Sequence, residues 1–100
     1  MFILNITFKT TWAIYDTWLP WLKENCLPKV TASVPHDQLV LRLLDVDESD
    51  GPTIAVQVKV VSALDLEAVE QQWLTDGMAL VHRVWGNECV HFATKMEVVP

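Results

Sequence analysis

Positive charge is scarce in this sequence. It holds 7 Lys and Arg residues against 13 Asp and Glu residues, which gives a formal net charge of -6. Proteins that bind the phosphate backbone need clustered Lys and Arg side chains to displace counterions. We therefore expect no nucleic-acid partner.

Cysteine is also rare. Cys26 and Cys89 lie far apart, and neither has a Cys or His neighbour at metal-binding spacing. This pattern indicates neither a zinc site nor a disulfide framework. We expect both residues to behave as small buried hydrophobes, and we expect no metal and no cofactor.

Long apolar runs are missing as well. The apolar residues at the N-terminus are interrupted by Asn5 and Thr7, and no basic segment precedes them. The chain therefore has neither the pattern of a signal peptide nor that of a membrane span, and we expect a cytoplasmic protein. With 51% hydrophobic residues among 100, the chain is long enough for a single compact domain over residues 1–100.

The clearest pattern is a β-hairpin over Gln38–Val61. Two apolar runs rich in Leu and Val flank a segment rich in Asp, Ser, Gly and Pro. Asp50-Gly51-Pro52 predicts a tight reversal, in which Gly51 takes a positive φ and proline supplies its fixed φ.

Before the hairpin, strict alternation over Phe2–Lys9 predicts a half-buried strand. A hydroxyl of Thr10 or Thr11 is placed to cap a helix that runs to about Cys26 and ends at Leu27-Pro28. Pro20 falls inside this helix, so we expect either a kink or a helix that begins near Asp16.

After the hairpin, Ser62 followed by Asp65 predicts the start of a second helix. Thr75-Asp76-Gly77 interrupts the helical pattern, which allows two helical pieces, and Gly86-Asn87 is the expected stop. The expected buried stripe consists of Leu66, Val69, Trp73, Leu80 and Val84.

Alternation over Cys89–Val99 predicts the last strand, with Val90, Phe92, Met96 and Val98 on its apolar side. The element order is therefore strand, helix, strand, strand, helix, strand. Right-handed crossovers turn this order into an α+β, ferredoxin-like βαββαβ fold. We expect a four-stranded antiparallel sheet in the order 4-1-3-2, with both helices on one face.

Five segments carry a resemblance to a known family; they are MFILNITF, WLPWLKENCLP, LVLRLLDVDESDG, TIAVQVKV and ECVHFATKMEVV. Together they resemble the domain-of-unknown-function 4286 family of small bacterial proteins, nearly from end to end. The resemblance implies a ferredoxin-like chain of the dimeric α/β-barrel group, in which two sheets pack face to face. Because these motifs are mostly hydrophobic patterns, they specify a fold better than a chemistry.

The sheet face without helices should meet a partner. By parity we expect it to hold Ile3, Asn5, Thr7, Lys9, Val40, Arg42, Leu44, Ala55, Gln57, Lys59, Val61, His91, Ala93, Lys95 and Glu97. This set is too apolar for a fully solvated surface, and the first hairpin strand is apolar on both sides. A homodimer through this face supplies the cover.

The same parity gathers four of the seven basic residues on that face. This predicts a site for a small anionic ligand, in which the cations supply charge and the neighbouring polar groups supply hydrogen bonds. The predicted ligand-binding residues are Asn5, Arg42, Gln57, Lys59, His91 and Lys95. The interpretation we favour over a ligand site is that these cations pair with acidic residues of a partner subunit, for which Asp45, Asp47, Glu48 and Asp50 are candidates.

An enzyme of the cofactor-independent monooxygenase or haem-degrading kind is a further alternative. Such enzymes of the dimeric α/β-barrel group use an Asn on the first strand with a Trp and a His on the second helix. Asn5, Trp73 and His82 stand in a similar order here. We favour a binding or structural module, because Trp73 belongs to the expected buried stripe. Convergence of side chains decides between the two: the module needs Arg42, Lys59 and His91 together, and the enzyme needs Asn5, Trp73 and His82 together.

Overall fold

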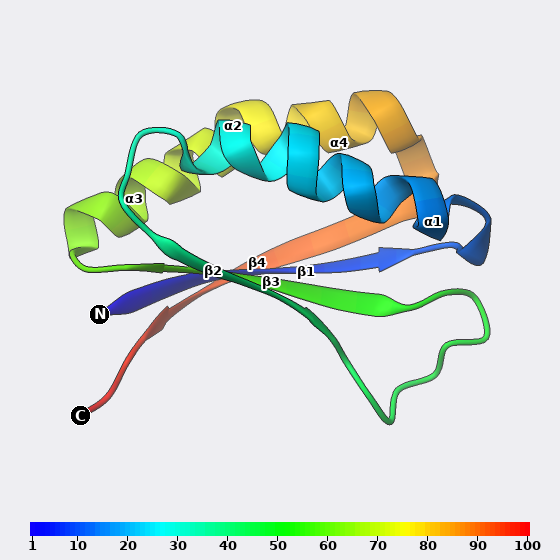
Figure 1. Ribbon diagram of the computed structural model, residues 1–100, viewed down its shortest axis with the longest axis horizontal. Helices are drawn as coiled ribbons and strands as arrows, with labels where there is room; N and C mark the ends of the chain where they lie inside the picture. The colour runs from blue at the N-terminus through cyan, green and yellow to red at the C-terminus, as the bar shows by residue number, and fades with distance from the viewer.

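The computed structural model describes residues 1–100 and consists of a sheet with helices on one side (Figure 1). All strand pairs are antiparallel, and the order across the sheet is β2-β3-β1-β4. The strands are β1 Phe2–Thr10, β2 Asp37–Arg42, β3 Thr53–Val60 and β4 Cys89–Glu97. The predicted α+β, ferredoxin-like βαββαβ fold and its strand order are confirmed.

The first helical segment runs further than expected. Helix α1 (Trp12–Trp21) continues through a π-helical turn, η1 (Leu22–Cys26), into α2 (Leu27–Thr31). The predicted end at Leu27-Pro28 is therefore wrong. A π turn already interrupts the regular α-helical hydrogen bonds, so the missing N–H of Pro28 removes little there. Pro20 lies inside α1, and the helix begins at Trp12 rather than near Asp16.

The second helical segment has the same design. Helix α3 (Ala63–Gln72) leads through the π turn η2 (Trp73–Gly77) into α4 (Met78–Trp85), followed by the short 3-10 helix η3 (Gly86–Glu88). The predicted cap is confirmed, because the Asp65 N–H donates to Ser62 Oγ at 3.1 Å. The predicted stop is confirmed too, since Gly86 takes a φ of 58° directly after α4.

The π turn also shifts the buried stripe of this segment. Val84 was expected to be buried but is 46% exposed, whereas Val81 is fully buried. A π turn inserts one extra residue into the helical repeat, which rotates the following side chains around the helix axis. Val69, which precedes the π turn, and Trp73, which begins it, are buried as predicted.

An aromatic cluster joins the sheet to both helical segments. Phe8 of β1 meets Trp18 of α1 with ring centroids 5.3 Å apart, and it meets Trp73 of η2 at 5.7 Å. Both pairs have the edge-to-face geometry that aromatic rings prefer. All three side chains are buried, so the core lies between the helices and one face of the sheet.

The connection between β2 and β3 is longer than a tight turn and spans residues 43–52. Its one residue with positive φ is Asp45, at 58°, so the prediction of a positive φ at Gly51 is wrong. Gly51 is needed for a different reason. A Cβ atom there would lie 1.7 Å from the Thr10 carbonyl oxygen, so only glycine lets the loop approach the end of β1.

Replacing Gly51 by Ala should therefore destabilise the fold. We expect Gly51→Ala to lower the free energy of unfolding by about 2–3 kcal/mol in urea titrations, because backbone must move to admit the methyl group. Asp50→Ala is the control, since it introduces the same alanine at the neighbouring exposed position of the loop. Equal unfolding midpoints for wild type and Gly51→Ala would contradict the close approach.

None of the helices combines the length and the apolar character needed to cross a lipid bilayer.

Candidate functional site

The candidate site is the sheet face turned away from the helices, which we call the open face (Figure 1). On the two central strands its residues are as predicted, apart from Val61, which lies beyond the end of β3. Ile3, Asn5, Thr7 and Lys9 of β1 pair with Lys59, Gln57, Ala55 and Thr53 of β3. Their neighbours along β1, such as Leu4 and Ile6, are fully buried under the helices.

On β4 the predicted side is wrong. Met96, Phe92 and Val90 pair with Ile3, Thr7 and Lys9, so these apolar residues lie on the open face with Thr94 between them. The residues expected there, His91, Ala93, Lys95 and Glu97, lie on the helix side instead. The alternation was recognised, but its apolar side was assigned to the helix-covered core.

On β2 the predicted side is wrong as well. Asp37, Leu39 and Leu41 pair with open-face residues of β3, whereas Val40 and Arg42 pair with Val56 and Ile54, which belong to the core. Leu44 lies beyond the end of the strand. Because β2 is apolar on both sides, its sequence pattern does not indicate which side faces the helices.

Two of the predicted ligand-binding cations are consequently engaged elsewhere. Arg42 forms an ion pair with Glu48 at 2.7 Å, and its guanidinium carbon lies 5.6 Å from the ring centroid of Trp12. Lys95 forms an ion pair with Glu70 of α3 at 3.3 Å. Neither side chain contributes charge to the open face.

Of the two lysines that remain on the open face, one is already bound. Lys9 Nζ donates to the carbonyl oxygens of Asp47 at 3.2 Å and Gly51 at 3.1 Å, and so holds the β2–β3 loop. Lys59 has no hydrogen bond or ion pair from its side chain within the chain.

Arg42, Lys59 and His91 therefore do not converge. Binding of an anion by the open-face residues Asn5, Gln57 and Lys59 stays a prediction.

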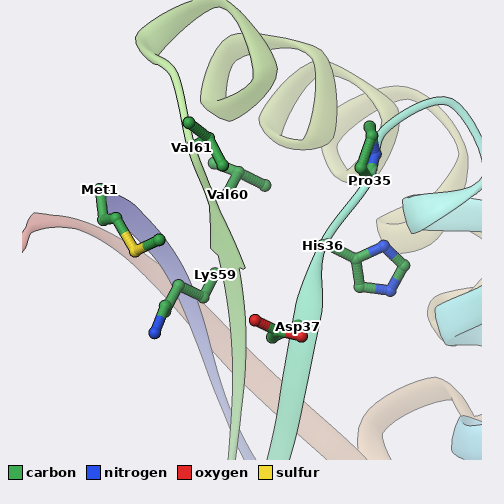
Figure 2. A pocket seen from close by; sticks show the side chains of 7 residues that line it. All are labelled: Met1, Pro35, His36, Asp37, Lys59, Val60 and Val61. Atoms are coloured by element: carbon green, nitrogen blue, oxygen red, sulfur yellow. The ribbon is translucent and has the colours of Figure 1, made fainter.

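Two hollows adjoin Lys59. One, of about 250 Å³, is lined by Met1, Pro35, His36, Asp37, Lys59, Val60 and Val61 (Figure 2). In this view the Lys59 side chain points away from His36, on the side of β3 where Met1 lies. The other, of about 300 Å³, lies on the open face and is lined by Ile3, Asp37, Gln38, Leu39, Gln57 and Lys59.

The residues of the enzyme alternative lie apart. Asn5 is on the open face, where its amide donates to Thr7 Oγ1 at 3.0 Å. Trp73 is buried on the opposite side of the sheet, and the His82 side chain is exposed on α4. The structure does not bring the three into one cleft.

Sequence reasoning missed the largest feature of this face, a set of exposed apolar side chains. Phe92 is 62% exposed, Val90 and Leu39 are each 58% exposed, and Leu41 and Met96 are also exposed. The alternation of β4 did indicate that Val90, Phe92 and Met96 share one side of the strand, but not which side. We name these five residues, Leu39, Leu41, Val90, Phe92 and Met96, the apolar patch.

The family model described as Domain of unknown function (DUF4286) matches residues 1–99. The chain belongs to this family. Its description assigns no activity, and no curated protein matches the chain.

Solved structures of similar fold confirm the ferredoxin-like architecture. A dimeric ferredoxin-like protein from an uncultured marine organism is similar with a TM-score of 0.73 and 10% identity, over 99% of this chain and 95% of that one. An ethyl tert-butyl ether D (EthD) family protein from Bacillus halodurans has a TM-score of 0.56 and 17% identity, over 99% of this chain and 100% of the other.

Burial disfavours the thiolate form of both cysteines in this DUF4286 chain. It raises the pKa of Cys26 to about 11 and that of Cys89 to about 12. No group of three His, Cys, Asp or Glu residues is arranged to hold a metal ion.

We expect neither thiol to react with Ellman's reagent at pH 8 in the folded protein, because both are buried and protonated. Both should react in concentrated denaturant, which serves as the control. Rapid reaction of one thiol under native conditions would show that it is accessible as thiolate.

Burial lowers the pKa of His91 below the ordinary value of 6.5. Its ring lies 5.1 Å from the Trp73 ring and 6.0 Å from the Phe8 ring, measured between centroids. The folded state therefore favours neutral imidazole and binds a proton less readily than the unfolded chain does.

Stability should accordingly fall as the pH drops below about 6.5, because the unfolded state then binds more protons. Urea midpoints measured at pH 7 and pH 5 should differ more for wild type than for His91→Gln. A wild-type pH dependence in His91→Gln would show that His91 is not responsible.

Proposed function

We propose that the protein is a cytoplasmic homodimeric binding or structural module, made of one domain per chain, whose two sheets pack open face to open face. The apolar patch is the observation that carries the proposal. Its five side chains stay exposed in the single chain although β-sheet faces rich in Leu, Val and Phe are normally covered.

The patch is energetically large enough to drive association. Burying a Val, Leu, Phe or Met side chain is worth about 1.5–3 kcal/mol, so full burial of this patch is favourable even after part of it offsets the entropy lost on binding. Leu39 and Leu41 lie on one edge strand, and Val90, Phe92 and Met96 lie on the other. The patch therefore lies along both edges of the face.

The centre of the open face is polar. Asn5 and Gln57 lie opposite each other on β1 and β3, and the side chain of Gln57 has no hydrogen-bond partner in the chain. A second copy of the chain supplies apolar cover for the edges and hydrogen-bond partners for the central amides. A two-fold axis places the apolar edges of one sheet against those of the other, and the amide groups against the same amide groups. That the similar marine protein is described as dimeric supports the same choice of partner.

A small anionic ligand, if one is held, would lie between the two sheets near Asn5, Gln57 and Lys59. No contact in the structure favours the monooxygenase or haem-degrading alternative, since Asn5, Trp73 and His82 lie apart.

A charge within the apolar patch should prevent assembly. By light scattering we expect wild type at twice the chain mass of 11.4 kDa and Phe92→Asp at the mass of one chain. The physical reason is that burying an unpaired carboxylate costs several kcal/mol, which weakens association by at least about 100-fold.

Leu64→Asp is the matched control, because Leu64 is 76% exposed but lies on α3, away from the open face. It should leave the dimer intact, and circular dichroism should show both variants folded. A wild type that stays monomeric at every concentration would overturn the proposal, as would a folded Phe92→Asp that remains fully dimeric.

A further inference from the structure

The β2–β3 loop, residues 43–52, projects from the sheet on the side of the open face (Figure 1). It exposes two apolar side chains, Leu44 at 77% and Val46 at 39%. Leu44 stands next to Asp45, which holds the chain reversal through its positive φ. The loop therefore presents a leucine followed by a carboxylate.

This loop is fixed to the body of the molecule at several points. The indole N–H of Trp12 donates to the Glu48 carbonyl oxygen at 2.7 Å, and the Trp12 backbone N–H donates to that of Asp50 at 3.2 Å. Lys9 Nζ holds the Asp47 and Gly51 carbonyl oxygens, and Arg42 holds the Glu48 carboxylate. A leucine on such a braced loop loses little further conformational freedom when a partner covers it.

A complementary hollow lies at the other end of the same face. It measures about 300 Å³, and its lining includes Ile3, Leu39, Gln57 and Lys59. In the β1–β3 register, Ile3 and Lys59 lie six residues from the Lys9 and Thr53 pair, where the chain's own loop is attached. The loop therefore leaves the hollow of its own chain unfilled.

We infer that each protomer of the dimer inserts Leu44 into this hollow of its partner. This inference rests on the proposed function. The two-fold axis would then run across the strands, so that the loop end of each sheet covers the hollow end of the other. Leu44 would pack against Ile3 and Leu39 of the partner subunit, and Asp45 would lie beside Lys59 of the partner subunit.

Charge supports this end-to-end arrangement. Lys59 forms no ion pair within its own chain, although Asp37 lies opposite it in the register and lines the same hollow. In the reverse arrangement, with like ends together, the loops of both copies would lie at the same end of the dimer, on opposite edges of the sheets. The acids Asp45, Asp47 and Asp50 of both copies would then gather at one end of the dimer, and like charges close together oppose association.

The first test removes the inserted side chain. We expect Leu44→Ser to raise the dimer dissociation constant, measured by sedimentation equilibrium, at least about 10-fold, because a buried leucine contributes at least this much. The stability of the isolated chain should not change. Urea titration should therefore give the same free energy of unfolding for the Leu44→Ser, Phe92→Asp double variant as for Phe92→Asp alone. Leu64→Ser is the matched control and should leave the dissociation constant unchanged.

The second test pairs opposite charges across the interface. Lys59→Glu alone should raise the dimer dissociation constant. In the Lys59→Glu, Asp45→Lys double variant, the dissociation constant should be at least about threefold lower than the value expected if the effects of the two single changes were independent.

The results separate this inference from the proposed function. If Phe92→Asp dissociates the dimer while Leu44→Ser leaves its dissociation constant unchanged, the face-to-face dimer stands and the inserted loop is wrong. Independent effects of the two charge changes would also overturn the contact between Asp45 and Lys59. If no variant changes the assembly, both proposals fall.

Discussion

The structure depends on one constraint, which is that a four-stranded sheet has two faces and the helices cover only one of them. On the covered face, Phe8 joins the sheet to Trp18 and Trp73 in a core without solvent access. The open face has no such layer, yet its edge strands carry residues such as Leu39 and Phe92. One folded chain therefore leaves part of its apolar residues exposed, and a second layer buries them.

Local patterns in the sequence were sufficient for the element order and the sheet. Alternation identified the strands, Ser62 and Asp65 marked the start of the second helix, and Gly86 marked its end. Thr75-Asp76-Gly77 correctly marked the interruption between α3 and α4, but the π geometry of both turns was not predictable, because inserting one residue into a helix has no distinctive composition. Their consequences were the helix that continues past Pro28 and the exchange of Val84 for Val81 in the core.

The site could be predicted only on the central strands. There, one set of alternate residues is entirely apolar and must face the helices, so Asn5, Gln57 and Lys59 were placed on the open face correctly. On the edge strands, alternation separates two sets without showing which set faces the helices. The register with β1 and β3 decides this, and register follows from tertiary packing that no local pattern records. The basic residues Arg42 and Lys95 were consequently placed on the wrong face.

The most direct test of the open face as an interface compares two methionines by hydroxyl-radical footprinting. Met96 lies in the apolar patch and Met78 lies on α4, and both are 36% exposed in the single chain. At a protein concentration where light scattering reports dimer, the account predicts that Met96 is oxidised several-fold more slowly than Met78 and that the difference disappears in Phe92→Asp. Equal oxidation rates for the two residues in the wild-type dimer would show that the open face stays uncovered, which contradicts the account.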